Sequence, residues 1–216
     1  MIRLTLLSAF LVTLAAQPGS ARPVLFSDKW KTLNFFSIPA TKYKMNGQSV
    51  DITANKSSSV AYKSLKQNDW KSTRASWRWS TTKSVPPTNL GKKGTDDRNI
   101  ALYFVFLDEK TARRIGRTAS ITKLLRAKNA RILTYVFGGN KPRGTFQRNP
   151  YLGKRGMIIV KRPAGSGRFS EKVNLAADYR RAFGAAPDAL VGVALASDSD
   201  GTKSAVMARV QRLVVE

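Results

Sequence analysis

The sequence predicts a mainly β fold: a single-domain, jelly-roll-like β-sandwich with one or two short helices. Two observations favour this class. The apolar residues mostly recur with the two-residue period of strands rather than the 3.6-residue period of helices. Turns rich in Gly, Pro, Asn and Ser separate these segments at short intervals, and about ten short strands with few helices are typical of a sandwich.

The expected strands follow one another along the chain. Asn46-Gly47, the dipeptide most typical of a tight hairpin, separates the first two. Trp77 and Trp79 alternate with polar residues, so they share one face, and we expect that face in the core. Ile100 to Leu107 is apolar in both phases, which indicates a central strand covered on two sides. In order, the expected strands cover residues 43–45, 49–53, 60–62, 75–80, 100–107, 131–137, 157–161, 168–174, 190–196 and 205–215.

Two segments are expected to be helical. Residues 109–128 form a basic helical excursion between two strands. Residues 175–183 form a short helix that Gly184 ends, with Pro187 beyond it.

Residues 1–21 have the pattern of a secretory signal peptide. Arg3 precedes a nearly unbroken apolar run, and small residues stand at 19–21, so we expect cleavage before Arg22. The alternative is an N-terminal membrane anchor, but the run is too short to span ~30 Å of hydrocarbon comfortably. Export without any Cys favours a bacterial periplasm or exterior. One domain is expected over 22–216, with no further membrane segment.

The chain contains no His and no Cys. Ser-His-Asp and Cys-His catalysis are therefore excluded, and so are disulfides. Zinc, haem and iron–sulfur sites are built mainly from the same two side chains, so we expect no cofactor. Any chemistry must use the 13 carboxylates, the 38 Lys and Arg, the aromatic rings and the backbone.

The formal net charge is +25, and it is concentrated in one stretch. Residues 110–172 hold 17 Lys and Arg but a single acid, Glu171. This stretch predicts a surface for an anionic envelope polymer or lipid head groups; the alternative is a solvated basic face. Nucleic acid is not expected, because no reader motif is present and the signal peptide removes the protein from the genome. The predicted polyanion surface consists of Arg113, Arg114, Arg117, Lys123, Arg126 and Lys128.

Two acidic segments lie next to apolar strands. Asp97 and Arg98 precede the central strand, and Asp198 and Asp200 follow the strand at 190–196. Loops of a sandwich cluster at its two ends, so we expect the two segments to form one ligand-binding site with Arg98 as its positive member. The alternative is two unrelated turns. Asp97 with Asp198 or Asp200 is also the only pair that we nominate for carboxylate catalysis.

A metal ion is not expected at these acids. Asp198 and Asp200 match part of a calcium loop, which leaves calcium as a minor alternative. The segment lacks the third acid and the bidentate Glu of an EF-hand, so a plain Asp/Gly turn is favoured.

Several landmarks taken in order resemble those of an uncharacterised family of exported bacterial proteins, mostly from Gram-negative species. The resemblance spans nearly all of 22–216. It implies a jelly-roll-like domain similar in outline to carbohydrate-binding sandwiches, and it implies no established activity. The landmarks are Trp77-Arg78-Trp79, Asp96-Asp97-Arg98, Asp178-Tyr179, Phe183-Gly184 and Asp198-Ser199-Asp200.

We therefore expect an exported envelope protein that binds a glycan or another anionic polymer without catalysis. The alternative is a carboxylate-dependent hydrolase acting on envelope carbohydrate, and a structural envelope protein is a third possibility. Binder and enzyme differ in whether the acids lie on open turns or line a closed cleft. The sequence decides neither that point nor the oligomeric state.

Overall fold

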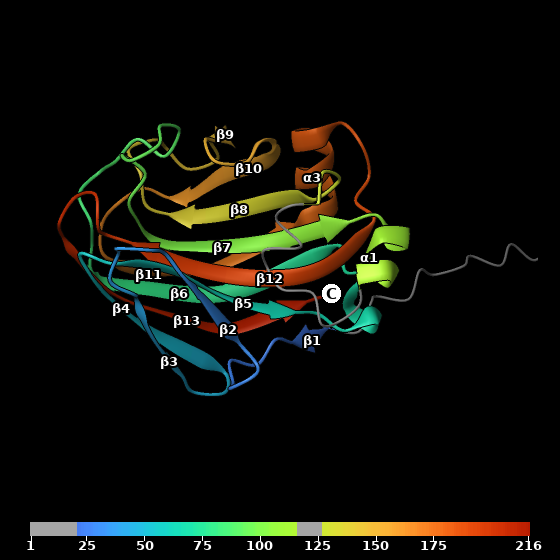
Figure 1. Cartoon of the computed structure of the whole chain (residues 1–216), viewed down its shortest axis with the longest axis horizontal. Coiled ribbons are helices and arrows are strands. Elements are labelled where there is room, and N and C mark those ends of the chain that lie inside the picture. The colour runs from blue at the N-terminus through green and yellow to red at the C-terminus, as the bar shows by residue number, and fades with distance from the viewer. Residues whose placement is uncertain (1–20, 116–126) are drawn as a thin grey trace, which may run out of the picture.

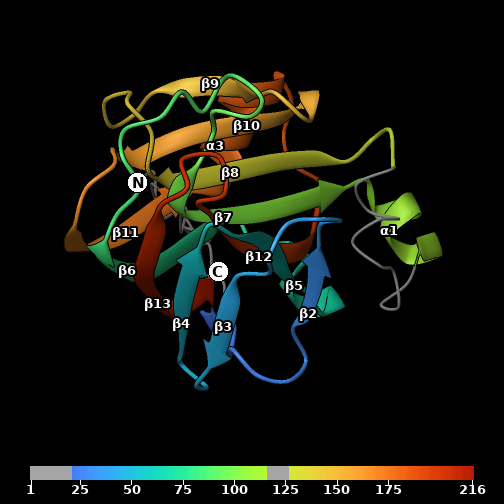
Figure 2. The same ribbon diagram turned by 60° about the vertical axis from the view of Figure 1, so that its left-hand side comes forward.

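Two β-sheets packed face to face form the molecule (Figure 1). The structure is a computed structural model, and it describes residues 21–115 and 127–216. The small sheet has six strands and the large sheet has seven. Figure 2 shows the β3–β4 hairpin of the small sheet on one side and β2 with β5 of the large sheet on the other.

The small sheet has the order β11-β6-β13-β4-β3, and β1 pairs with the far end of β13. Within the described residues all of its pairings are antiparallel. Its strands are β11 (Gly167–Asn174), β6 (Arg74–Lys83), β13 (Ala205–Val215), β4 (Ser49–Asn55), β3 (Lys42–Met45) and β1 (Arg22–Pro23).

The large sheet has the order β2-β5-β12-β7-β8-β10-β9. Among its described pairings only β8 with β10 is parallel. Its strands are β2 (Lys31–Asn34), β5 (Ser58–Ser64), β12 (Ala189–Asp198), β7 (Arg98–Leu107), β8 (Arg131–Phe137), β10 (Gly153–Arg162) and β9 (Phe146–Asn149).

Consecutive strands repeatedly change sheet. β4 lies in the small sheet, β5 in the large, β6 in the small and β7 in the large, and β10 to β13 alternate in the same way. This alternation gives the jelly-roll-like character of the sandwich. The predicted fold class, a mainly β sandwich with short helices, is confirmed.

The core lies between the sheets, and the tryptophans of β6 are at its centre. Trp77 and Trp79 are buried, as their shared phase predicts. The ring of Trp77 packs against Phe104 of β7 and Tyr135 of β8, with centroids 6.0 and 5.5 Å apart. Trp30 and Trp70 are buried as well, so the four tryptophans fix the sandwich rather than a ligand.

The helix α3 (Leu175–Phe183) has the predicted bounds. The Asn174 side chain accepts a hydrogen bond from the backbone N–H of Ala177 at its start. Gly184 ends it in the left-handed conformation that favours glycine, with φ 78°. Both termini of α3 were therefore readable from residue type.

The prediction of a helix over 109–128 is wrong at its end. The described helix is α1 (Glu109–Ile115), and residues 127–130 form a turn. The Asn129 side chain donates to Thr111 in the first turn of α1 and to Asp108 before it, so the chain folds back there instead of continuing as a helix. Residues 116–126 lie outside the described residues.

Short elements escaped the prediction. The strands β1, β2 and β9 and the 3-10 helix η1 (Gln67–Asp69) span two to four residues each, too few for a period to show. The predicted signal peptide lies almost wholly outside the described residues. Within them, no helix is long and apolar enough to cross a membrane.

Candidate functional site

A groove of about 430 Å³ lies on the outer face of the large sheet. Residues on a strand alternate between faces, and the odd positions of β7, such as Tyr103 and Val105, line the groove, whereas Phe104 packs in the core. The prediction of a central strand covered on two sides is confirmed for β7: it is the middle strand of the large sheet, and within Ile100–Leu107 only Tyr103 is not fully buried. The floor of the groove is aliphatic and includes Val60, Val105, Ile132, Val136, Ile158 and Ala194.

The polar end of the groove forms where β7 begins and β12 ends. The two strands are antiparallel neighbours, and Arg98 pairs in register with Asp198. The turn with Asp96 and Asp97 precedes Arg98, so both carboxylates reach the same end of the groove. The structure therefore brings together the two loops that carry Asp97, Arg98, Asp198 and Asp200.

Arg98 is held by partners on several sides. Its Nη1 donates to the backbone oxygen of Asp96 at 2.7 Å and to Oδ2 of the same residue at 2.8 Å. The same Nη1 lies 3.4 Å from Oδ2 of Asp198, and Nη2 donates to the Tyr103 hydroxyl at 3.1 Å. Its side chain is only 13% exposed, so this guanidinium ties β7 to β12 and to the preceding turn.

Asp97 is committed to the neighbouring turn. Its Oδ2 accepts hydrogen bonds from the backbone N–H of Thr202 at 2.6 Å and from the Thr202 hydroxyl at 2.5 Å. Its Oδ1 accepts from the N–H of Gly201 at 3.3 Å, and a Cβ on that glycine would lie 3.0 Å from this oxygen. Both oxygens of Asp97 therefore hold the 201–204 turn, and the residue is buried.

Asp198 is the carboxyl group with the unusual environment. Burial raises its pKa to about 8; Arg98 opposes the shift, and the neighbouring Asp200 and Asp97 add to it. Its Oδ1 is buried and has no hydrogen-bond partner among the described residues. The raised pKa favours the protonated form of Asp198 at neutral pH, and a carboxyl group in that form can donate a proton.

A metal ion fits these residues poorly. One oxygen from each of Asp97, Asp198 and Asp200 lies within 4.8 Å of the others, and carboxylate oxygens are ligands for calcium. However, both oxygens of Asp97 already accept hydrogen bonds from the turn. The guanidinium of Arg98 occupies one side of Asp198, so a cation would meet a buried positive charge.

Two aromatic residues complete the site, and sequence reasoning missed both roles. Tyr151 stands on the rim with 57% exposure, and its hydroxyl donates to Oδ1 of Asp96 at 2.9 Å. It comes from the β9–β10 turn, so no local spacing links it to the acids. Phe35, 39% exposed, lies after β2 and also lines the groove. Tyr103 also lines the groove, and its position two residues before Val105, on the same face of β7, was the available sequence signal.

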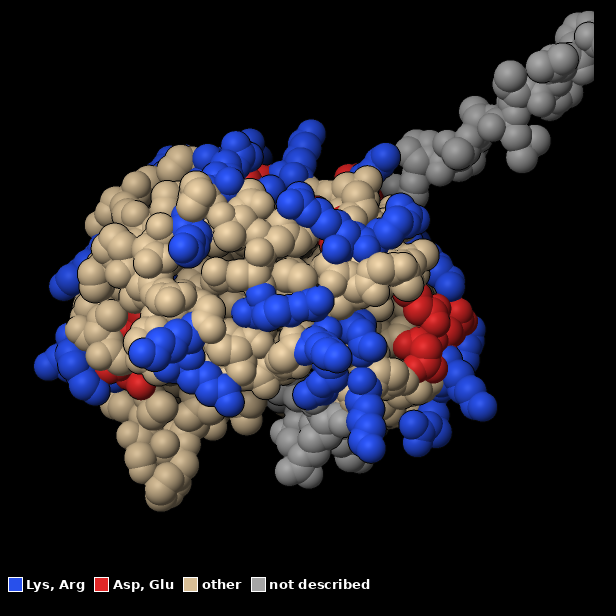
Figure 3. Space-filling view, turned by 90° about the horizontal axis from the view of Figure 1, so that it is seen from above, with Lys and Arg blue, Asp and Glu red and all other residues tan. Residues whose placement is uncertain are grey.

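Part of the predicted polyanion surface can be described. Arg113 pairs with Glu109 one turn earlier on α1, and Arg114 and Lys128 do not line the groove described above. Arg117, Lys123 and Arg126 lie outside the described residues. On the side of β9 and β10, Lys and Arg are scattered over the surface rather than gathered in one hollow (Figure 3).

Solved structures with a similar outline have low sequence identity to this chain. One is the xyloglucanase domain of NopAA, a type three effector from Sinorhizobium fredii in complex with cellobiose: 8% identity, TM-score 0.42, covering 93% of this chain and 99% of that chain. Another is the catalytic domain of Humicola grisea Cel12A in complex with a thio cellotetraose: 16% identity, TM-score 0.45, covering 91% and 99%. A third is the family 11 xylanase from Neocallimastix patriciarum: 8% identity, TM-score 0.37, covering 87% and 100%.

No curated protein is similar enough in sequence to count as a match. One family model does match, over residues 28–214, which is most of the chain. It covers both acidic segments, the tryptophans of β6 and the strands that build the groove. The chain therefore belongs to the family described as Protein of unknown function (DUF3047).

Proposed function

We propose that the protein binds a neutral glycan in the groove of the large sheet, without catalysis. The observation that carries this proposal is the layout of the groove: an aliphatic floor, two aromatic rims and a polar end. Sugar rings have apolar faces that pack on such surfaces, and their hydroxyls donate to carboxylates and tyrosines. The groove extends well beyond the acids, so it accommodates a chain rather than a single polar group.

The charge of the polar end favours a neutral glycan over an anionic polymer as the ligand of this groove. Four carboxyl groups, those of Asp96, Asp97, Asp198 and Asp200, surround the single cation Arg98. Even with Asp198 protonated, negative charge is in excess. An anionic polymer would be repelled at this end, whereas a neutral glycan would not.

Alanine substitution on the rim tests the binding proposal. We expect Phe35→Ala and Tyr151→Ala each to weaken binding of a neutral polysaccharide about fivefold, since an aromatic contact is worth about 1 kcal/mol. The measurement is titration calorimetry with a panel of soluble β-glucans and xylans. Phe36→Ala is the matched control, because Phe36 is 99% exposed and does not line the groove. Equal affinity in all three variants would contradict the proposal.

A second candidate, a carboxylate-dependent glycoside hydrolase, is favoured by the raised pKa of Asp198. A general acid must hold its proton at working pH, and Asp198 does so beside Asp200, whose carboxylate is the available partner. Asp97 is a poor partner, because both of its oxygens hold the 201–204 turn. The nominated pair is therefore Asp198 as acid with Asp200 as base or nucleophile.

Release of reducing ends from the polysaccharide that binds best separates the two candidates. Hydrolysis predicts turnover that falls as the pH rises through about 8, where Asp198 loses its proton. It also predicts that Asp198→Asn abolishes turnover and retains binding. Binding without turnover by the unsubstituted protein at any pH supports the non-catalytic proposal.

We also propose that the protein is exported, on the strength of the pattern in residues 1–21 alone. Intact-mass measurement of the expressed protein tests it. A periplasmic species that begins at or near Arg22 is expected, and full-length protein confined to the cytoplasm would contradict export.

A further inference from the structure

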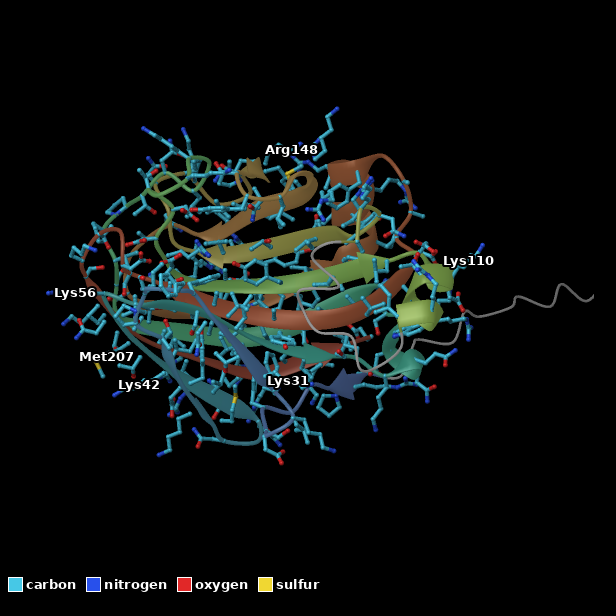
Figure 4. All side chains as sticks on the ribbon, in the orientation of Figure 1. Lys31, Lys42, Lys56, Lys110, Arg148 and Met207 are labelled. Atoms are coloured by element: carbon cyan, nitrogen blue, oxygen red, sulfur yellow. The ribbon has the colours of Figure 1, made fainter. Side chains whose placement is uncertain are left out.

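A second hollow, of about 670 Å³, lies where β1, β2 and β5 meet, and we call it the basic groove. Four lysines line it: Lys29 and Lys31 from the start of β2, and Lys63 and Lys66 from the end of β5. Figure 4 shows Lys31 at the foot of β2, close to β1. The antiparallel pairing of β2 with β5 brings these two segments of the sequence together.

The basic groove has an excess of positive charge that the fold does not neutralise. Arg22 also lines it, but its guanidinium pairs with Asp69 at 3.2 Å. Asp28 and Asp69 are the only acids among the lining residues; the charge of Asp69 also acts on Lys63, so two carboxylates face four lysines and Arg22. In the part of the chain that the structure describes, none of these lysines has a carboxylate within 4.0 Å.

Lys63 shows the effect of the neighbouring positive charges most clearly. Its Nζ donates to the backbone oxygen of Leu25 at 3.0 Å, an uncharged partner that fixes its position. Burial lowers its pKa, and the positive charges of Lys29 and Lys66 lower it further. A bound anion would relieve this repulsion and would be held by several ammonium groups at once.

The basic groove and the first groove lie along the same strands. Tyr62 of β5 lines the basic groove, and Val60, two residues earlier on the same face, lines the first. On β2, Lys31 and Leu33 are divided in the same way and pair in register with Tyr62 and Val60. The two hollows are therefore neighbours with opposite charge.

We propose that the basic groove binds the anionic groups, whether carboxylate, sulfate or phosphate, of an acidic polysaccharide. This goes beyond the neutral-glycan proposal and does not depend on it. Lysine ammonium groups are compact charges without the planar fork that reads phosphodiesters and bases. Single-stranded nucleic acid is bound by rows of stacking aromatics, whereas Tyr62 is the one aromatic side chain that lines this hollow. An acidic polysaccharide is thus the better fit.

The location differs from the sequence-based expectation for an anionic partner. That expectation relied on the density of charge within residues 110–172. The proposal relies instead on lysines from two segments outside it, which are sparse in sequence and adjacent in space.

The test is charge reversal in the full chain, with a matched pair of controls. The groove variant is Lys31→Glu with Lys66→Glu; the control is Lys42→Glu with Lys110→Glu. All four lysines are exposed, and the net charge changes equally. Neither control residue lines the first groove or the basic groove, and Figure 4 labels both of them. The probes are polygalacturonate, heparin, inorganic polyphosphate and oligo-dT of similar charge.

At physiological salt we expect the groove variant to bind polygalacturonate or heparin about tenfold more weakly than the unsubstituted protein. The control should lose less than about threefold. A preference for polygalacturonate, heparin or polyphosphate identifies the anionic group that is read.

Equal losses of affinity in the two double variants would overturn the proposal, because they would show that the total charge of the protein, and not the basic groove, determines binding. Tightest binding to oligo-dT would overturn it in favour of nucleic acid. Thermal melting of each variant checks folding. Should Lys66→Glu destabilise the chain, Lys31→Glu against Lys42→Glu repeats the comparison. Binding of neutral glycan serves as the separate readout, because the groove variant should leave it unchanged.

Discussion

The two hollows of the large sheet differ in how their charges are compensated. At the polar end of the first groove, charged groups hold one another: Arg98 contacts Asp96 and Asp198, and Asp97 holds the 201–204 turn. In the basic groove, the four lysines have no such partners among the described residues. The first set of charges stabilises the fold, and the second is available to a ligand. The amount of charge in a hollow is thus a weak guide to function. Whether opposite charges of the fold already neutralise that charge is the better guide.

The strongest way to break this comparison is to remove one cation from each hollow. Arg98→Met leaves the buried Asp96 carboxylate without its cation and Asp198 without its ion-pair partner, and we expect a loss of about 3–5 kcal/mol of unfolding free energy. Lys63→Met removes a charge that its neighbours repel, so a change below about 1 kcal/mol is expected. Urea denaturation measures both. Similar losses would mean that Lys63 is as structural as Arg98.

A smaller difference in unfolding free energy is expected between substitutions of one acid from each groove, Asp97 and Asp28. Asp97→Asn replaces one acceptor oxygen by an NH2 group that faces the N–H of either Gly201 or Thr202, which should cost about 2–3 kcal/mol and lower the melting temperature by roughly 4–12 °C. Asp28→Asn in the exposed part of the basic groove should lie within about 0.5 kcal/mol of the unsubstituted protein. Calorimetry checks both. A stable Asp97→Asn protein would remove the structural role that we assign to this carboxylate.

The pH dependence of stability sharpens the comparison further. The pKa of Asp198 is raised to about 8 in the folded chain, whereas an unfolded Asp titrates near 4. The folded state therefore binds the extra proton, and stability should fall as the pH rises from about 4 to about 8, then level off. Asp198→Asn should flatten this slope by comparison with the unsubstituted protein. An identical slope in the variant would show that other groups cause it.

The smallest expected effect is on the basic groove itself. Replacing Lys66 by Gln reduces repulsion among the lysines and should raise stability by a few tenths of a kcal/mol at low salt. The gain should vanish at high salt, because exposed charges are then screened. Melting curves in low and high sodium chloride check it, with Lys42→Gln as the control.

Much of the fold was predictable, because local patterns and tertiary packing agree there. Trp77 and Trp79 lie on the same face of their strand, and both side chains are buried in the core as that alternation predicts. Asn174 and Gly184 mark the two ends of α3. The strands β1 and β2 were not predictable, since so few residues show no period. The helix expected to reach residue 128 was wrong at its end: residues 127–130 form a turn, because the Asn129 side chain holds the chain against Thr111 of α1.

The convergence of the two acidic segments was also predictable, from the rule that sandwich loops cluster at the ends. The environment of each acid was not predictable from the sequence. That Asp97 is held by Thr202, while Asp198 keeps its proton, depends on side-chain directions within a turn. The lysines of the basic groove were missed because the pairing of β2 with β5, which joins them, had no sequence signal of its own.

The pairing of β1 with β13 has a consequence for engineering. Arg22 lies opposite Val215 across one antiparallel ladder, where facing Cα atoms are about 5 Å apart. In a chain that starts at Arg22, a linker of a few residues is therefore long enough to join that residue to Glu216 and close a ring. Such a closed chain allows circular permutation, with new ends opened at an exposed turn such as Lys92-Lys93-Gly94.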